Sequence, residues 1–134
     1  MIVKQLSVFL ENTPGRLYAV TSALNDNGMD VKALMLADTA DFGVLRLIVD
    51  DPEKTLKVLQ EKGFTVKITE VIAVEIQHTF KEVQKILEIL SRKSVNIEYM
   101  YAFMGENPGK TLIIFRVDNL KAAAEYLKEE GIMV

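Results

Sequence analysis

The chain opens with a strand-like alternation, because Leu6, Val8 and Leu10 recur at every second position. A two-residue period is typical of a β-strand with one buried face. Thr13-Pro14 then predicts a helix start, with Thr13 as N-cap and Pro14 at the first helical position. Apolar residues recur at helical spacing up to Asn27-Gly28, which ends the helix.

The same pattern continues to residue 69. Two further strands are expected at residues 31–37 and 44–49, and a second helix begins at Asp51-Pro52. A fourth strand is expected at residues 64–69. The order strand-helix-strand-strand-helix-strand is that of the ferredoxin-like unit, an α+β βαββαβ fold.

The second half of the chain repeats the first. Residues 6–13 align with residues 72–79, and Asp30-Val31 aligns with Asn96-Ile97 at the same offset. We therefore predict two tandem modules, residues 1–70 and 71–134, joined without a Gly-, Ser- or Pro-rich linker. The second module ends in a short strand expected at residues 132–134.

The alternation also predicts which residues face away from the helices. This open face is too apolar to be exposed to solvent, so we expect another surface to pack against it. The simplest such surface is the same face of a second chain in a homodimer. A register shifted by one residue would instead swap the two faces of each strand. The expected open face holds Ser7, Phe9, Leu34, Leu36, Val44 and Ile48, and in the second module Met100, Leu112 and Ile114.

Composition narrows the classes of function. The chain has no cysteine and one histidine, which excludes disulfides, thiol nucleophiles and Cys/His zinc sites. The net charge is −3 and the basic residues are scattered, so the sequence shows no cluster of positive charge of the kind that binds nucleic acid. We expect no metal, no cofactor and no catalytic residues. There is no signal peptide and no run long enough to span a membrane, so a cytoplasmic protein is expected.

The two strand-to-helix loops differ in the residues available to cap the helix that follows. Residues 79–82, Thr-Phe-Lys-Glu, form a capping box, in which the helix satisfies its own first amides. Residues 13–16, Thr-Pro-Gly-Arg, place Arg16 where the other loop has its acid. Free amides beside a cation suit a bound carboxylate or phosphate. The alternative is that Arg16 simply points into water.

At these residues the chain resembles the ACT domain. The resemblance rests on Leu10 to Leu17, with its Pro-Gly, and on Asn27 to Val31, and it covers the chain as two tandem copies. It implies a non-catalytic regulatory module of amino acid metabolism that binds an amino acid and acts on an enzyme. It also implies that two four-stranded sheets join side by side into one of eight strands, with helices on one face.

The resemblance places the ligand at the interface between the modules. One site would join the first loop to the start of the second strand of the other module. The reciprocal site, with His78, Phe80 and Lys81 facing Asp30 and Val31, would be degenerate. Tyr99 and Tyr101 are expected on the helix-facing side, where Tyr99 lines the side-chain pocket. The predicted ligand-binding residues are Asn12, Thr13, Pro14, Gly15, Arg16, Leu17, Asn96, Ile97 and Tyr99.

Other functions fit the same fold. An acylphosphatase-like hydrolase would use an arginine and an asparagine around a phosphate, for which Arg16 and Asn12 are the candidates. An RNA-binding module would need exposed aromatics and a basic face, whereas this chain is acidic. A purely structural or interaction module is the remaining alternative.

Overall fold

The computed structural model describes residues 1–38 and 41–132. Helices and strands follow the order predicted for two βαββαβ modules, except that a single strand spans the junction of the modules and that α4 is the last element in the described residues. The elements are β1 (Ile2–Glu11), α1 (Arg16–Asp26), β2 (Val31–Asp38), β3 (Phe42–Val49), α2 (Pro52–Glu61), β4 (Thr65–Gln77), α3 (Phe80–Arg92), β5 (Ile97–Met104), β6 (Lys110–Val117) and α4 (Leu120–Glu129).

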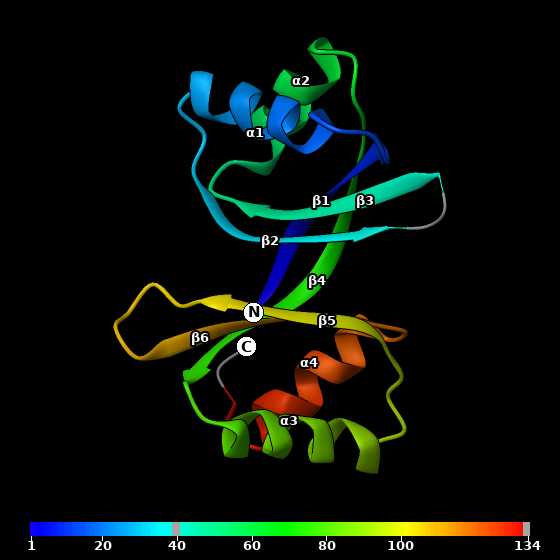
Figure 1. Ribbon diagram of the computed structural model, residues 1–134. Coiled ribbons are helices and arrows are strands. Elements are labelled where there is room, and N and C mark those ends of the chain that lie inside the picture. The colour runs from blue at the N-terminus through cyan, green and yellow to red at the C-terminus, as the bar shows by residue number, and fades with distance from the viewer. Residues whose placement is uncertain (39–40, 133–134) are drawn as a thin grey trace. The chain divides into compact units, whose positions relative to one another are not determined.

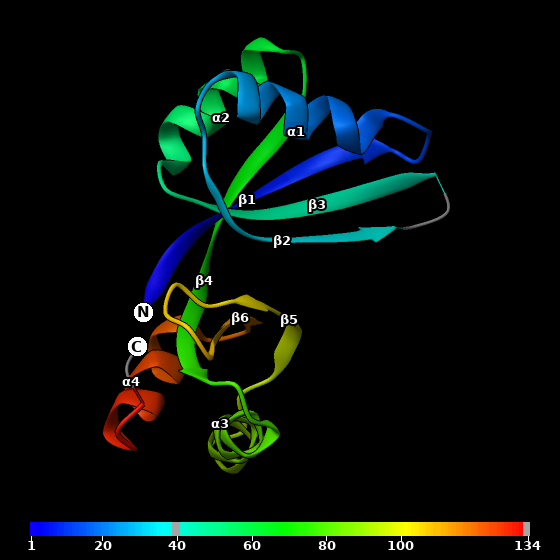
Figure 2. The same ribbon diagram turned by 60° about the vertical axis from the view of Figure 1, so that its left-hand side comes forward.

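The chain forms two compact units. One is Lys4–Thr69, and the other combines Met1–Val3 with Glu70–Val134. In the first unit α1 and α2 lie together on one face of β1, β2 and β3 (Figures 1 and 2). In the second, α3 and α4 cover one face of β5 and β6 (Figure 1). Each unit is thus a two-layer α+β sandwich.

The sheet has six strands in the described part of the chain, in the order β2-β3-β1-β4-β6-β5. The expected eight-stranded sheet is therefore wrong. The strands predicted at residues 64–69 and 72–76 are one continuous strand, β4. The reason is local: Val71-Ile72-Ala73-Val74 extends the strand and no Gly or Pro interrupts it. The pairs β1/β3, β2/β3, β4/β6 and β5/β6 are antiparallel.

The start of β1 supplies an edge strand to the second unit. The Met1 amino group donates to the Ala73 carbonyl oxygen at 3.1 Å, and the Ala73 amide donates to the Met1 oxygen at 2.8 Å. Such a reciprocal pair marks antiparallel pairing. Met1–Val3 thus lie where the fourth strand of the second module was expected. That strand was predicted at residues 132–134; Ile132 is not in a strand, and residues 133–134 lie outside the described residues.

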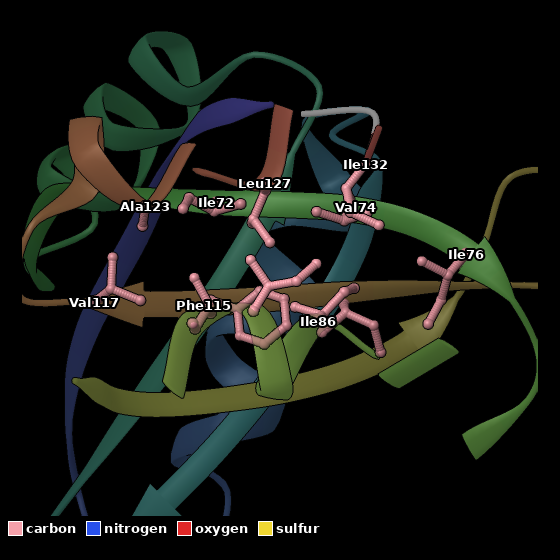
Figure 3. Close-up of a cluster of buried hydrophobic side chains, with 12 residues drawn as sticks. Ile72, Val74, Ile76, Ile86, Phe115, Val117, Ala123, Leu127 and Ile132 are labelled. Atoms are coloured by element: carbon pink, nitrogen blue, oxygen red, sulfur yellow. The ribbon is translucent and has the colours of Figure 1, made fainter. Parts of the chain in front are cut away.

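Each unit has its own apolar core under its helices. In the Lys4–Thr69 unit the core joins β1 and β3 to α1 and α2, and it includes Leu6, Val8 and Leu10 as the alternation predicts. Figure 3 shows the core of the other unit, where Phe115 lies among side chains from β4, β6, α3 and α4. Burying each such large side chain contributes about 1.5–3 kcal/mol to folding.

A β-bulge near the start of β2 and of β5 changes which residues face the helices. The register shifts between Val31 and Ala33, after which Leu34 pairs with Leu47 and Leu36 with Leu45. Leu45 and Leu47 belong to the core, and directly paired residues share a face. Leu34 and Leu36 therefore point to the helix side, and their expected place on the open face is wrong.

The bulge recurs at the equivalent place in β5, between Ile97 and Tyr99. Met100 then pairs with the core residue Phe115, so its expected place on the open face is also wrong. An extra residue in one strand reverses the alternation beyond it, which a strict two-residue period cannot anticipate. The open-face residues that the register confirms are Ser7, Phe9, Val44, Ile48, Leu112 and Ile114.

Candidate functional site

The loop between β1 and α1 is tied down by its own backbone. The Thr13 amide donates to the Glu11 oxygen at 2.8 Å, and the Arg16 amide donates to the Thr13 oxygen at 3.4 Å. The residue at the N-cap is Gly15, with φ +86, and the helix begins at Arg16. The prediction of Thr13 as N-cap is wrong, because its backbone oxygen closes a turn ahead of the helix.

The start of α1 lacks a side-chain cap. The N-cap residue, Gly15, provides no side-chain hydrogen bond to the first amides, and the first turn holds no acidic residue. First-turn amides have no acceptor inside the helix itself. The Arg16 amide is already bonded to the Thr13 oxygen, so the amides that follow it, those of Leu17 and Tyr18, are the ones that a ligand could use. Among the four helices in residues 1–38 and 41–132, the other three are capped, by Asp51 in α2, Thr79 in α3 and Asn119 in α4. The asymmetry between residues 13–16 and 79–82 is thereby confirmed.

Space and charge at this helix start both favour an anion. A side chain added at Gly15 would meet nothing within 4 Å, so the first turn has open room beside it. The Arg16 guanidinium carbon lies 5.0 Å from the centre of the Phe64 ring, and the Arg16 Nε is buried without a hydrogen-bond partner. Arg16 therefore packs against Phe64 rather than extending freely into water.

The other predicted residues, Asn96, Ile97 and Tyr99, lie at the start of β5. The Asn96 amide donates to Asp118 Oδ1 at 3.1 Å, and the Asn96 oxygen accepts from the Asp118 amide at 3.2 Å. Tyr99 pairs with Arg116, next to the core residue Phe115 in the strand, so it lies on the open face. Tyr101 pairs with the open-face residue Ile114 and lies on the same side. The expectation that Tyr99 and Tyr101 face the helices is therefore wrong, and the cause is the bulge.

The candidate residues thus form two groups. Asn12 to Leu17 belong to the Lys4–Thr69 unit, and Asn96, Ile97 and Tyr99 belong to the other. Each group is ordered by hydrogen bonds within its own unit. That both groups contact one ligand stays a prediction.

The structure also reveals a feature that the sequence did not suggest. A pocket of about 240 Å³ lies beside the start of α3, in the loop expected to be degenerate. His78, at the position equivalent to Asn12, lines it, and its Nδ1 lies 2.6 Å from Thr111 Oγ1. The available signal was a small residue, Ala102, at a position where the first module has Leu36.

The described residues do not meet the requirements of a metal site or of a membrane-spanning helix. Within residues 1–38 and 41–132, no group of three His, Cys, Asp or Glu side chains is placed to hold a metal ion. None of the helices in that part of the chain combines the length and apolar character that a membrane crossing needs.

Comparisons with known structures agree with the fold. A crystal structure of a protein from Bacteroides thetaiotaomicron is 41% identical, with a TM-score of 0.91, covering 98% of this chain and 90% of that one. The regulatory subunit of aspartate kinase from Thermus thermophilus has a TM-score of 0.64 at 14% identity, covering 96% of each chain. That from Thermus flavus has a TM-score of 0.63 at 16% identity, covering 96% and 94%.

No curated protein matches the sequence. The family model described as an ACT domain pair matches residues 1–133, which is nearly the whole chain. The resemblance read from the Pro-Gly loop and the strand start that follows α1 is confirmed. The chain therefore belongs to the ACT domain family, as an ACT domain pair.

Proposed function

We propose that the chain is a non-catalytic regulatory protein of amino acid metabolism that binds an amino acid. Support comes from the ACT domain pair itself and from the similar fold of aspartate kinase regulatory subunits. The observation that carries the proposal is the uncapped start of α1, with open space at Gly15 and no acid in the first turn.

The chemistry assigns a role to each group. The Leu17 and Tyr18 amides, which follow the bonded Arg16 amide, hold the ligand's α-carboxylate, helped by the helix dipole and by the positive charge of Arg16. The amide side chains of Asn12 and Asn96 each offer a donor and an acceptor, which suits an α-amino acid zwitterion. The remaining predicted contacts are Thr13, Pro14, Leu17, Ile97 and Tyr99.

Calorimetry with the twenty amino acids tests the proposal. At least one should bind and raise the melting temperature. At a free ligand concentration about one hundred times Kd, the free energy of unfolding should increase by about 2.7 kcal/mol. A matched pair isolates the anion site. Gly15→Asp and Gly15→Asn introduce side chains of equal size at the same left-handed position, but only Asp is charged. Binding should vanish in Gly15→Asp and persist, weakened, in Gly15→Asn.

Equal loss in both Gly15 variants would contradict carboxylate binding at this helix. Absence of any amino acid ligand would favour the alternative of an interaction module. Asn96→Ala tests the group formed by Asn96, Ile97 and Tyr99. The test is valid whether these residues contact a ligand bound to the same chain or to a second chain. It should weaken binding by about tenfold if the Asn96 side chain contacts the ligand.

Regulation requires a partner and a change that ligand binding can bias. An enzyme of amino acid metabolism is the proposed partner, which would place the chain in the cytoplasm. A homodimer through the open face is the proposed assembly. Phe9 on that face is exposed, whereas Ile48 and Ile114 are already buried within the single chain, so a second chain would cover the part of the face around Phe9.

A further inference from the structure

A pocket of about 240 Å³ lies in the second module, between the end of β4, the start of α3 and the strands β5 and β6. Its wall is mainly aliphatic, and Ile76 and Ile113 in it also belong to the buried core. Exposed residues of the β4–α3 loop and of the start of α3 stand at its rim. The lining residues are Ile76, Gln77, His78, Thr79, Phe80, Val83, Ala102, Thr111 and Ile113.

The two modules differ at the positions that decide this space. By strand register Leu36 is equivalent to Ala102, and Gly43 to Thr111. In the first module Leu36 lies over Gly43, with its Cδ1 at 3.2 Å from where a side chain would start. In the second module Ala102 carries one methyl group at this position. A leucine at position 102 would therefore extend toward Thr111, which lines the pocket.

The walls of the pocket present almost only apolar surface, and the polar side chains of His78, Thr79 and Thr111 already have hydrogen-bond partners within the chain. The hydrogen bond between His78 Nδ1 and Thr111 Oγ1 orients the imidazole and leaves Nε2 to donate or accept, according to the tautomer. The start of α3 is already occupied, because Thr79 Oγ1 accepts from the Glu82 amide. Glu82 also places a carboxylate in the first turn, which disfavours an anionic guest.

We propose that this pocket binds a small uncharged molecule with an aromatic or branched aliphatic body. An apolar cavity of about 150 Å³ suffices for benzene. The present pocket, at about 240 Å³, therefore has room for such a ring with a small substituent. This ligand class differs from the carboxylate proposed for the start of α1, and the two sites are independent.

Methyl NMR of the full chain, titrated with phenol, toluene and benzoate, tests the proposal. Phenol and toluene should both shift the methyl signals of Ile76, Val83 and Ile113 saturably, and the charged benzoate should bind weakest. Ala102→Leu restores the residue of the first module and should weaken phenol binding by at least about tenfold. Because Ala102 is exposed, the substitution adds no volume to the buried core.

Two further variants separate the outcomes. Val83→Leu introduces the residue that the first module has at the equivalent position, Leu17, and should also weaken phenol binding. This variant keeps the proposal testable if the Ala102→Leu chain does not fold. Gly15→Asp should leave phenol binding unchanged, whatever it does to amino acid binding. The proposal is overturned if millimolar phenol causes no saturable shift, if benzoate binds as well as phenol, or if the folded pocket variants bind phenol as well as the parent chain.

Discussion

The Arg16 guanidinium carbon lies 5.0 Å from the centre of the Phe64 ring. Arg16 is the first residue of α1, and Phe64 directly precedes β4. The contact fixes a cation beside the helix start that has no side-chain cap. It therefore links the packing of the Lys4–Thr69 unit to the electrostatics of the proposed anion site.

A double-mutant cycle with Arg16→Met and Phe64→Leu should reveal this contact. We expect a coupling energy of about 0.5–1 kcal/mol, because the guanidinium lies over the ring in a half-buried site. Urea unfolding of the parent chain and the three variants gives the free energies. Additive losses, with no coupling, would show that Arg16 does not interact with the ring in solution.

The two equivalent threonines should differ in their contribution to stability. Thr79→Ala removes the cap of α3 and should lower the free energy of unfolding by about 1 kcal/mol. Thr13→Ala should cost less than about 0.5 kcal/mol, because its side chain does not cap α1. Asp51→Ala, which removes the cap of α2, is the positive control. Equal costs for both threonines in urea unfolding would contradict the asymmetry.

Local signals in the sequence predicted most of the fold. The caps at Asp51 and Thr79 are chemical features of a few adjacent residues, so their helices begin where expected. The bulges after Val31 and Ile97 depend on pairing with another strand, and they reversed the faces of Leu36 and Tyr99. Non-local pairing also explains the unexpected strand contributed by Met1–Val3.

The candidate site was predictable to a similar degree. The contrast between Arg16 and Glu82 correctly indicated which helix start is open. The position of the cap was missed because the Thr13 backbone oxygen, rather than its side chain, accepts from Arg16. The pocket near His78 was missed because the difference between Ala102 and Leu36 gains meaning only once the strand register is known.

Stability should rise with pH between about 6 and 8. Burial lowers the pKa of the Met1 amino group from 8.0 to about 6. The unfolded chain therefore binds more protons in this range, and the free energy of unfolding increases as the pH rises. Two pKa units correspond to about 2.7 kcal/mol, and half exposure of the amine reduces the expected gain to about 1 kcal/mol. Urea unfolding at the two pH values measures it.

The acetylated chain is the control for this pH dependence. Acetylation removes the titrating amine but leaves an N–H that can donate to the Ala73 oxygen. The difference in slope between the free and acetylated chains therefore isolates Met1 from every other titrating group. Identical slopes would show that the amine is not buried in solution.

Phe9 gives a test of the proposed homodimer. It pairs with Val44 on the open face and is 45% exposed, so a second chain seated on that face would bury it. Phe9→Arg would then place an unpaired charge in the interface and should convert dimers to monomers in analytical ultracentrifugation. Tyr18→Arg is the matched control, since Tyr18 is 77% exposed but belongs to α1 on the helix side. Monomers of the parent chain, or equal loss of dimer in both variants, would rule out this interface.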